Sequence, residues 1–188
     1  MRLQLLKYLP MLVAALALSA CGGGDGGPGA NTGTAGVPVT PASVLVTPSS
    51  EIITKGQTIS RTVKIESADN AFYVAFDILY NPAILQFVNA KEGSFMDNDG
   101  ADATSMQAVL QSGTTMQNGV PLKRLTIGLT RLGDIGGISG SGTLVSVTFF
   151  AIGSGKSPIL ISTPRGIKDM NNQDVAVNTW QDATITVQ

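Results

Sequence analysis

The sequence contains no histidine, and Cys21 is its only cysteine. These two absences exclude catalysis by Ser–His–Asp or Cys–His groups, and they exclude zinc sites built on histidine or cysteine. Chemistry based on paired carboxylates, or on hard cations bound by oxygen atoms, is still possible. The chain therefore has few ways to build an enzyme.

Charged and aromatic residues are also scarce, at 13% and 5% of the chain. With 22 glycines and many threonine, serine and valine residues, this composition favours an all-β domain over a helical one. The formal net charge is −1, and no basic stripe runs along the chain. Nucleic acid is therefore not expected as a partner, and nothing in the sequence indicates a cofactor.

The amino terminus has the layout of a secretory signal. In residues 1–21, "MRLQLLKYLPMLVAALALSAC", Arg2 and Lys7 form a basic region before an apolar segment at 9–18 that is too short to span a bilayer. The letters "LSAC" that end at Cys21 resemble the bacterial lipobox, which implies cleavage before Cys21 and a diacylglycerol on its sulfur. An ordinary signal peptide that is cleaved elsewhere is the alternative.

Three segments follow from this reading: a signal peptide at 1–20, a glycine-rich disordered tether at 21–42, and a folded domain at 43–188. The tether contains too few apolar residues to bury a core. Roughly 20 glycine-rich residues reach about 25 Å on average, enough to hold a domain clear of lipid head groups. Because Gly22 follows the cysteine, the lipoprotein sorting pattern indicates the outer membrane of a Gram-negative host.

The folded part reads as short strands separated by turn residues, with clear alternation in "VKIES", "RLTIGLTRL" and "TLVSVTFFAI". The pattern predicts an all-β, nine-stranded sandwich of two sheets with jelly-roll topology. The nine predicted strands span residues 44–47, 58–66, 72–80, 87–92, 106–111, 124–131, 143–151, 158–162 and 183–188.

The stretch "FYVAFDILYNPAILQF", residues 72–87, is the most informative. One register of its strand is apolar and predicts a core face: Phe72, Val74, Phe76, Ile78 and Tyr80. The other register is too apolar for a plain solvent face and predicts a binding surface: Tyr73, Ala75, Asp77 and Leu79. Asn81-Pro82 then ends the strand, because proline lacks an N–H donor and disfavours helix in the residue before it.

The segment "FDILYNPAILQFVNAKEGSF" resembles the third and fourth strands of cohesin domains. "VKIES" before it, and "SGSGTLVSVTFFAIGSGKSPILI" and "IKDMNNQDVAVNTWQDATITV" after it, extend the resemblance over residues 44–188 in the same order. Cohesins grip dockerin helices, so the resemblance implies a flat face made from the third, fifth, sixth and eighth strands. By position, this face comprises Tyr73, Ala75, Asp77, Leu79, Gln107, Val109, Gln111, Arg124, Thr126, Gly128, Thr130 and Arg131.

The chain departs from the best-known cohesins at three positions of this face. Those cohesins place an asparagine and an aspartate where this chain has Tyr73 and Ala75, and their acidic residue near the end of the sixth strand falls near Arg131. Two protein partners therefore remain open, a dockerin-like helix and an unrelated protein. The function that the sequence favours is a membrane-anchored, non-catalytic adaptor.

Binding of polysaccharide is the alternative, because cohesins resemble carbohydrate-binding modules in fold. Sugar platforms need exposed coplanar aromatic rings, and Trp180 is expected to pack in the core or at an edge. The acidic loops "DNDGAD" and "DMNNQD" carry oxygen atoms that calcium could use, but neither completes an EF-hand, and no metal site is predicted. A glycosidase using Asp77 with Glu66 or Asp134 would need a cleft that nothing in the sequence indicates.

Overall fold

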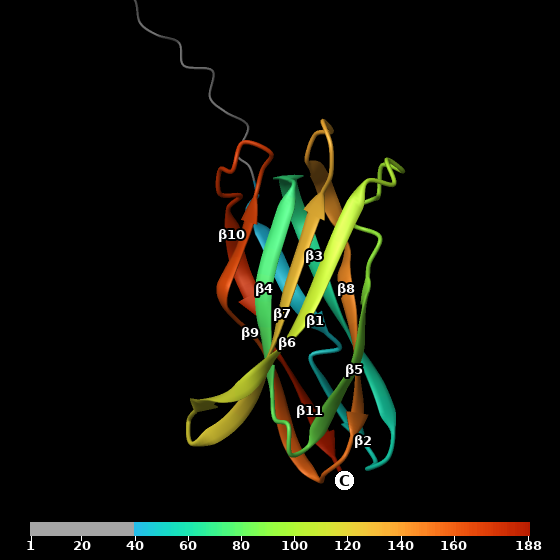
Figure 1. Ribbon diagram of the computed structural model, residues 1–188, viewed down its shortest axis with the longest axis vertical. Coiled ribbons are helices and arrows are strands. Elements are labelled where there is room, and N and C mark those ends of the chain that lie inside the picture. Colours follow the sequence, from blue (N-terminus) through green and yellow to red (C-terminus); the bar gives the residue numbers. More distant parts are fainter. Residues whose placement is uncertain (1–39) are drawn as a thin grey trace, which may run out of the picture. The chain divides into compact units, whose positions relative to one another are not determined.

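The computed structural model describes residues 40–188, which lie in one compact unit and form two packed β-sheets (Figure 1). The five-stranded sheet has the order β10 (Val177–Gln181), β1 (Ala42–Thr47), β3 (Thr58–Ala71), β8 (Ile138–Ala151) and β5 (Leu85–Glu92). The six-stranded sheet has the order β2 (Ser50–Ile53), β11 (Ala183–Val187), β9 (Gly155–Lys168), β4 (Tyr73–Tyr80), β7 (Val120–Arg131) and β6 (Thr104–Gln117).

The predicted all-β sandwich is confirmed, with eleven strands in place of nine. The two additional strands, β2 and β10, have four and five residues, and most of their side chains are exposed. They form sheet edges, where each pairs in parallel with one neighbour. Strands this short and this exposed leave no alternating pattern in the sequence.

The core lies between the sheets and follows the predicted register. In β4 the inward side chains are Val74, Phe76 and Ile78, and all three are buried. Tyr80 packs on Phe149 of β8 with ring centroids 5.0 Å apart, and burial raises the pKa of the Tyr80 hydroxyl. Alternation thus fixes one continuous apolar layer between the sheets.

Most connections carry the chain from one sheet to the other. Within residues 40–188, only β6 and β7 follow one another in the same sheet. Their hairpin turns at Asn118 and Gly119, whose φ angles of 51° and 77° suit a tight two-residue turn. A register shift between Leu110 and Thr114 bulges β6, and beyond it the hairpin projects away from the sandwich (Figure 1).

Cys21, the predicted signal peptide and most of the predicted tether lie outside the described residues. No helix within residues 40–188 has the length and apolar character needed to cross a membrane.

Candidate functional site

The four strands expected to form the docking face are neighbours in the structure. The third, fifth, sixth and eighth predicted strands correspond to β4, β6, β7 and β9, and the sheet runs β9-β4-β7-β6. Their outward side chains therefore share one surface, opposite the core. This surface divides into two halves that differ in exposure.

The first half, which we call the open half, has a floor of small residues. Ala75 of β4 lies opposite Gly128 of β7 and opposite Gly166 of β9, so three strands contribute to one row. A side-chain carbon added at Gly128 or Gly166 would meet no atom within 4 Å. The row lies in a hollow of about 420 Å³, whose lining also includes Tyr73, Gln107, Val109, Pro164, Arg165 and Lys168.

The rim of the open half combines an exposed aromatic ring with basic groups. Tyr73 is 42% exposed. The ammonium of Lys168 binds the carboxylate of Asp174, with 2.8 Å between Nζ and Oδ1. Arg165 donates a hydrogen bond of 2.7 Å from Nη1 to the carbonyl of Ile161. No carboxylate within residues 40–188 pairs with it.

Trp180 does not contribute a ring to this surface. Its ring lies 6.4 Å from that of Phe76, a core residue, and the guanidinium of Arg165 covers it at 5.3 Å from the ring centroid. The tryptophan packs at the side of the sandwich, as expected, and residues 40–188 place no flat set of aromatic rings around it. This arrangement does not favour a sugar platform.

The second half of the surface, which we call the closed half, is sealed by its own side chains. Asp77 was expected to be exposed, and this prediction was wrong: only 1% of the residue is accessible. Its carboxylate accepts hydrogen bonds from the hydroxyl of Thr126, at 2.7 Å, and from the guanidinium of Arg124. Arg124 also donates to the carbonyl of Thr163, at 3.2 Å, and so bridges β7 to β9 across Asp77.

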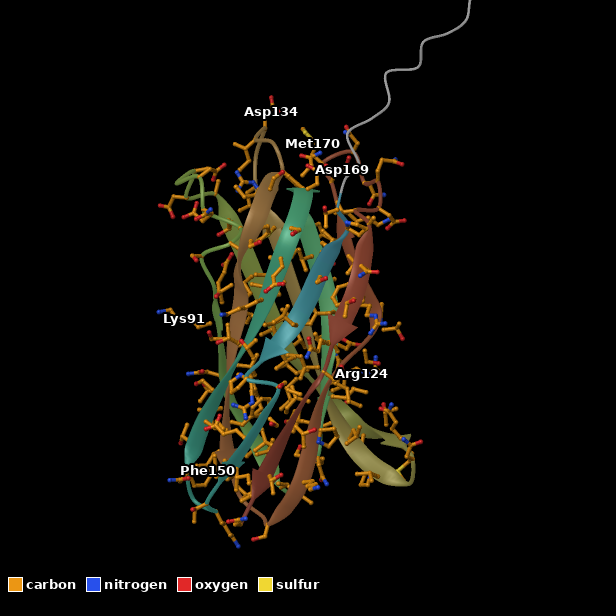
Figure 2. The ribbon with its side chains drawn as sticks, turned by 180° about the vertical axis from the view of Figure 1, so that it is seen from behind. Lys91, Arg124, Asp134, Phe150, Asp169 and Met170 are labelled. Atoms are coloured by element: carbon orange, nitrogen blue, oxygen red, sulfur yellow. The ribbon has the colours of Figure 1, made fainter. Side chains whose placement is uncertain are left out.

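Leu79 was likewise expected to be exposed but is buried, with 3% of the residue accessible. Leu79 and Leu122 are both buried, yet neither belongs to the core cluster between the sheets. Both occupy the outward register of their strands, near the point where the β6–β7 hairpin leaves the sandwich. Figure 2 shows Arg124 at this same base of the hairpin.

Arg131 was expected on the docking face and is also buried, with 2% accessible. Its Nε donates to the carbonyl of Gly136 at 2.8 Å, and its Nη atoms donate to the Met96 carbonyl and to Asp99. The hydrogen bond from Arg131 is the main cause of a lowered pKa of Asp99. Position 131 shares the register of Leu125, so the alternation itself directs Arg131 away from the docking face.

Of the predicted face, Tyr73, Gln107, Val109 and Gln111 are exposed, and Ala75, Arg124, Thr126, Gly128 and Thr130 are partly exposed. Sequence reasoning missed the contribution of β9 beyond residue 162: Pro164, Arg165, Gly166 and Lys168. Thr163-Pro164 interrupts the strand pattern there, and β9 bulges opposite Phe76. The return of an apolar residue at Ile167 is the signal that the strand continues.

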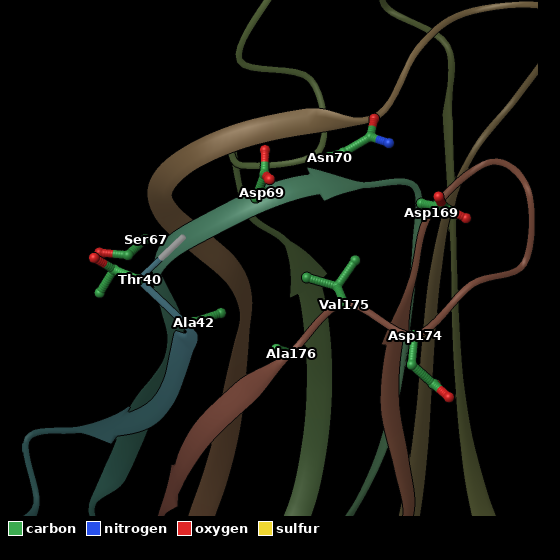
Figure 3. Close-up of a pocket in the computed structure, with 9 residues that line it drawn as sticks. All are labelled: Thr40, Ala42, Ser67, Asp69, Asn70, Asp169, Asp174, Val175 and Ala176. Atoms are coloured by element: carbon green, nitrogen blue, oxygen red, sulfur yellow. The ribbon is translucent and has the colours of Figure 1, made fainter. Parts of the chain in front are cut away.

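The acidic loops form turns. Asp169 Oδ1 accepts hydrogen bonds from the N–H groups of Asn171 and Gln173, at 2.9 and 2.8 Å. Asp97 Oδ1 accepts one from the N–H of Asp102. A small hollow of about 210 Å³ lies beside Asp169, and Figure 3 shows that the acidic side chains around it do not converge. Within residues 40–188, no three metal-ligating side chains gather to hold an ion.

Comparisons with known proteins agree with this architecture. The cohesin from the archaeon Archaeoglobus fulgidus, described as non-cellulosomal, is 20% identical with a TM-score of 0.61, over 79% of this chain and 92% of that chain. The sixth cohesin of scaffoldin B from Acetivibrio cellulolyticus, solved in complex with a Cel5 dockerin, is 14% identical with a TM-score of 0.56, over 79% of this chain and 100% of that one. At these identities the likeness shows the fold alone.

A third similar structure is the OlpA cohesin of Clostridium thermocellum, solved in complex with the dockerin Doc918. It is 12% identical with a TM-score of 0.56, over 79% of this chain and 100% of that chain. No curated protein matches the sequence. The family model of the cohesin domain matches residues 43–187, which include ten of the strands in full and nearly all of β1. The chain therefore belongs to the cohesin family.

Proposed function

We propose that this chain is a non-catalytic docking module that binds a protein partner on the open half of its β9-β4-β7-β6 surface. The observation that supports this most is the row formed by Ala75, Gly128 and Gly166. Glycine weakens a strand because it packs no side chain and loses more conformational freedom on folding. Two glycines on either side of Ala75, in the middle of a sheet, mark a place where another molecule can approach the backbone closely.

The shape and charge of the open half suit a helical partner. A sheet surface with a shallow hollow can accept a large apolar side chain from an amphipathic helix, beside Tyr73 and between Pro164 of β9 and Val109 of β6. Arg165, which pairs with no carboxylate in the described part of the chain, can bind an acidic residue of the same helix. Cohesins of similar structure have been solved with dockerins, so a dockerin-like helix is the first partner to test.

Substituting Gly128 with leucine tests this proposal, because it fills the hollow without touching the core. A fragment that starts at residue 37 contains every described strand and can be immobilised to capture secreted proteins of the host. A protein with a dockerin-like helix, retained by the wild-type fragment and lost with Gly128→Leu, would support the docking face. Lys64→Leu, on the exposed outer side of β3, is the matched control and should retain the partner. Equal retention by Gly128→Leu would contradict the proposal.

We further propose that Cys21 carries lipid and holds the domain at a membrane, in a Gram-negative host at the outer membrane. The support is the lipobox-like sequence and the position of the only cysteine at the end of the signal-like segment 1–21. Two or more acyl chains anchor a protein stably, since each buried methylene contributes about 0.8 kcal/mol. With the full-length chain expressed in such a host, Cys21→Ala should move the protein from the membrane fraction to a soluble one. An unchanged membrane fraction would contradict lipidation.

A further inference from the structure

The outer edge of β6 is an unusual sheet edge. β6 is the last strand of the six-stranded sheet, and among residues 40–188 it pairs only with β7. It spans Thr104–Gln117, fourteen residues, so a long row of its backbone N–H and C=O groups has no strand of the described part beside it. Such rows are templates for pairing with another chain, and natural proteins usually protect them.

The usual protection by charge is missing at this edge. No charged residue occurs between Asp102 and Lys123. The other three edges differ: β5 carries Lys91 and Glu92, β2 carries Glu51, and β10 has only five residues. Lys91 extends outward from the edge strand β5 (Figure 2). Among the four edges, only that of β6 is both long and uncharged.

The apolar side chains of β6 are left partly uncovered. Met106 and Ala108 face the core but are only partly buried, because no strand lies beyond them. Val109 and Leu110 are 50% and 42% exposed. A further strand at this edge would cover side chains on both faces of β6 at once. The bulge between Leu110 and Thr114 limits regular pairing to the part from Thr104 to Leu110.

We infer that this part of β6 pairs with the same segment of a second copy of the chain, antiparallel about a two-fold axis. About a two-fold axis the segment pairs with its own copy, so a charged residue in it would lie close to the same charge in the copy. The uncharged segment avoids this repulsion, and its apolar side chains match those of the copy. The pairing extends the six-stranded sheet in its own plane, and it leaves the hollow of the open half uncovered.

Sedimentation equilibrium of the fragment 37–188 tests the inference, with circular dichroism as the check on folding. The mass should rise from one chain toward two between about 10 µM and about 1 mM, the range of a small interface. Val109→Lys should raise the dimer dissociation constant at least tenfold, because lysine at an edge blocks strand pairing. Val88→Lys is the matched control, since Val88 is 51% exposed on the edge strand β5 and should leave the constant unchanged.

Disulfide trapping locates the contact, because a fragment without Cys21 contains no cysteine. Antiparallel neighbours have Cα atoms about 4.5–5.5 Å apart, within reach of a disulfide. A single cysteine introduced at one of positions 106–109 should give a covalent dimer on mild oxidation, and Val88→Cys should not. A wild-type fragment that stays monomeric up to 1 mM would overturn the inference. So would dimers that Val109→Lys leaves intact, or that only Val88→Cys traps.

Discussion

The open and closed halves of one sheet surface use the same register of β4 in opposite ways. Tyr73 and Ala75 leave a hollow, whereas Asp77 and Leu79, on the same side of the same strand, are buried. The cross-strand neighbours explain the difference. Ala75 lies between two glycines, while Asp77 lies beside Thr126 and is covered by Arg124.

This comparison separates the direction of a side chain from its exposure. Alternation along a strand decides which face a residue points to. Exposure depends on the length and polarity of the residues on neighbouring strands. These residues can be distant in the sequence, as Arg124 lies 47 positions from Asp77. A binding surface is thus defined by rows across strands, and the open half is one such row.

Among residues of the open and closed halves, the largest expected effect on stability is the loss of Asp77. Asp77→Ala leaves Arg124 and Thr126 without their shared acceptor in a buried place, and we expect it to lower the free energy of unfolding by about 2–3 kcal/mol. The value lies below that for a fully buried pair because the Arg124 side chain is 30% exposed and water can replace part of the contact. Urea denaturation at pH 7 measures it.

Two companion variants sharpen this first test. Asp77→Ala combined with Arg124→Met removes both partners and should recover part of the loss. Ala75→Ser changes the neighbouring position in the open half and should cost less than 0.5 kcal/mol. If Asp77→Ala costs as little as Ala75→Ser, the two halves do not differ in the way that their burial indicates.

A smaller effect on stability is expected from the Arg131–Asp99 ion pair at the far end of β7. In this pair the arginine is the buried partner, whereas in the Arg124–Asp77 pair it is the carboxylate. Arg131 is buried and Asp99 is exposed at the surface. Because the pKa of Asp99 is lowered from its ordinary 3.8, the pair stabilises the fold above that pH, and the contribution disappears as the pH falls through the lowered pKa. Asp99→Asn should therefore be less stable than wild type at pH 7 and nearly equal to it in strong acid. A stability difference that persists at low pH would show that the charge of Asp99 is not the cause.

The fold was predictable from sequence because its main strands are long and alternate clearly. The nine predicted strands are all present, and the inward residues of β4 and β7 were identified correctly. The far part of the β6–β7 hairpin was missed, although Asn118-Gly119 is a strong signal for a two-residue turn. β2 was missed because three of its four residues are exposed, and it is held by pairing with β11 and by the bond of Glu51 to the buried Arg61.

The site was predictable only in outline. Sequence order and resemblance grouped the correct four strands, but they could not show that Asp77 is covered or that Gly166 lies beside Ala75. Both facts depend on the register between strands and on the bulge at Pro164 in β9. A register cannot be read from one strand alone.

Gly128→Val should change the stability of the domain only slightly. Unlike the substitutions of Asp77 and Asp99, it should not destabilise the fold. An added side chain at Gly128 meets no atom within 4 Å, and glycine in a strand costs about 0.5–1 kcal/mol relative to alanine. We therefore expect the melting temperature to stay constant or to rise by a few degrees. Binding of the partner should fall sharply, because the valine occupies the hollow.

The matched control for Gly128→Val is the same substitution at Gly137. There the added carbon would lie 2.4 Å from the carbonyl oxygen of Asn70, and a backbone atom cannot move away cheaply. Gly137→Val should thus destabilise the domain clearly, while Gly128→Val does not. Equal destabilisation by the two variants would mean that the floor of the open half is not free space.

The smallest expected change in stability belongs to Tyr73→Ala. Tyr73 is 42% exposed and its side chain is not part of the core cluster, so its removal should alter the free energy of unfolding by less than about 0.5 kcal/mol. Val74→Asp, one position along and buried, is the contrasting variant and should prevent folding, because it places an unpaired charge in the core.

The effect of Tyr73→Ala on binding should be much larger than its effect on stability. An aromatic side chain near the centre of an interface often contributes about 2 kcal/mol, which is roughly a thirtyfold change in affinity. Calorimetric titration of the captured partner against wild type and Tyr73→Ala measures the ratio of the two dissociation constants. A folded Tyr73→Ala variant that binds with unchanged affinity would move the contact away from the open half, since Tyr73 is the exposed aromatic residue at its rim.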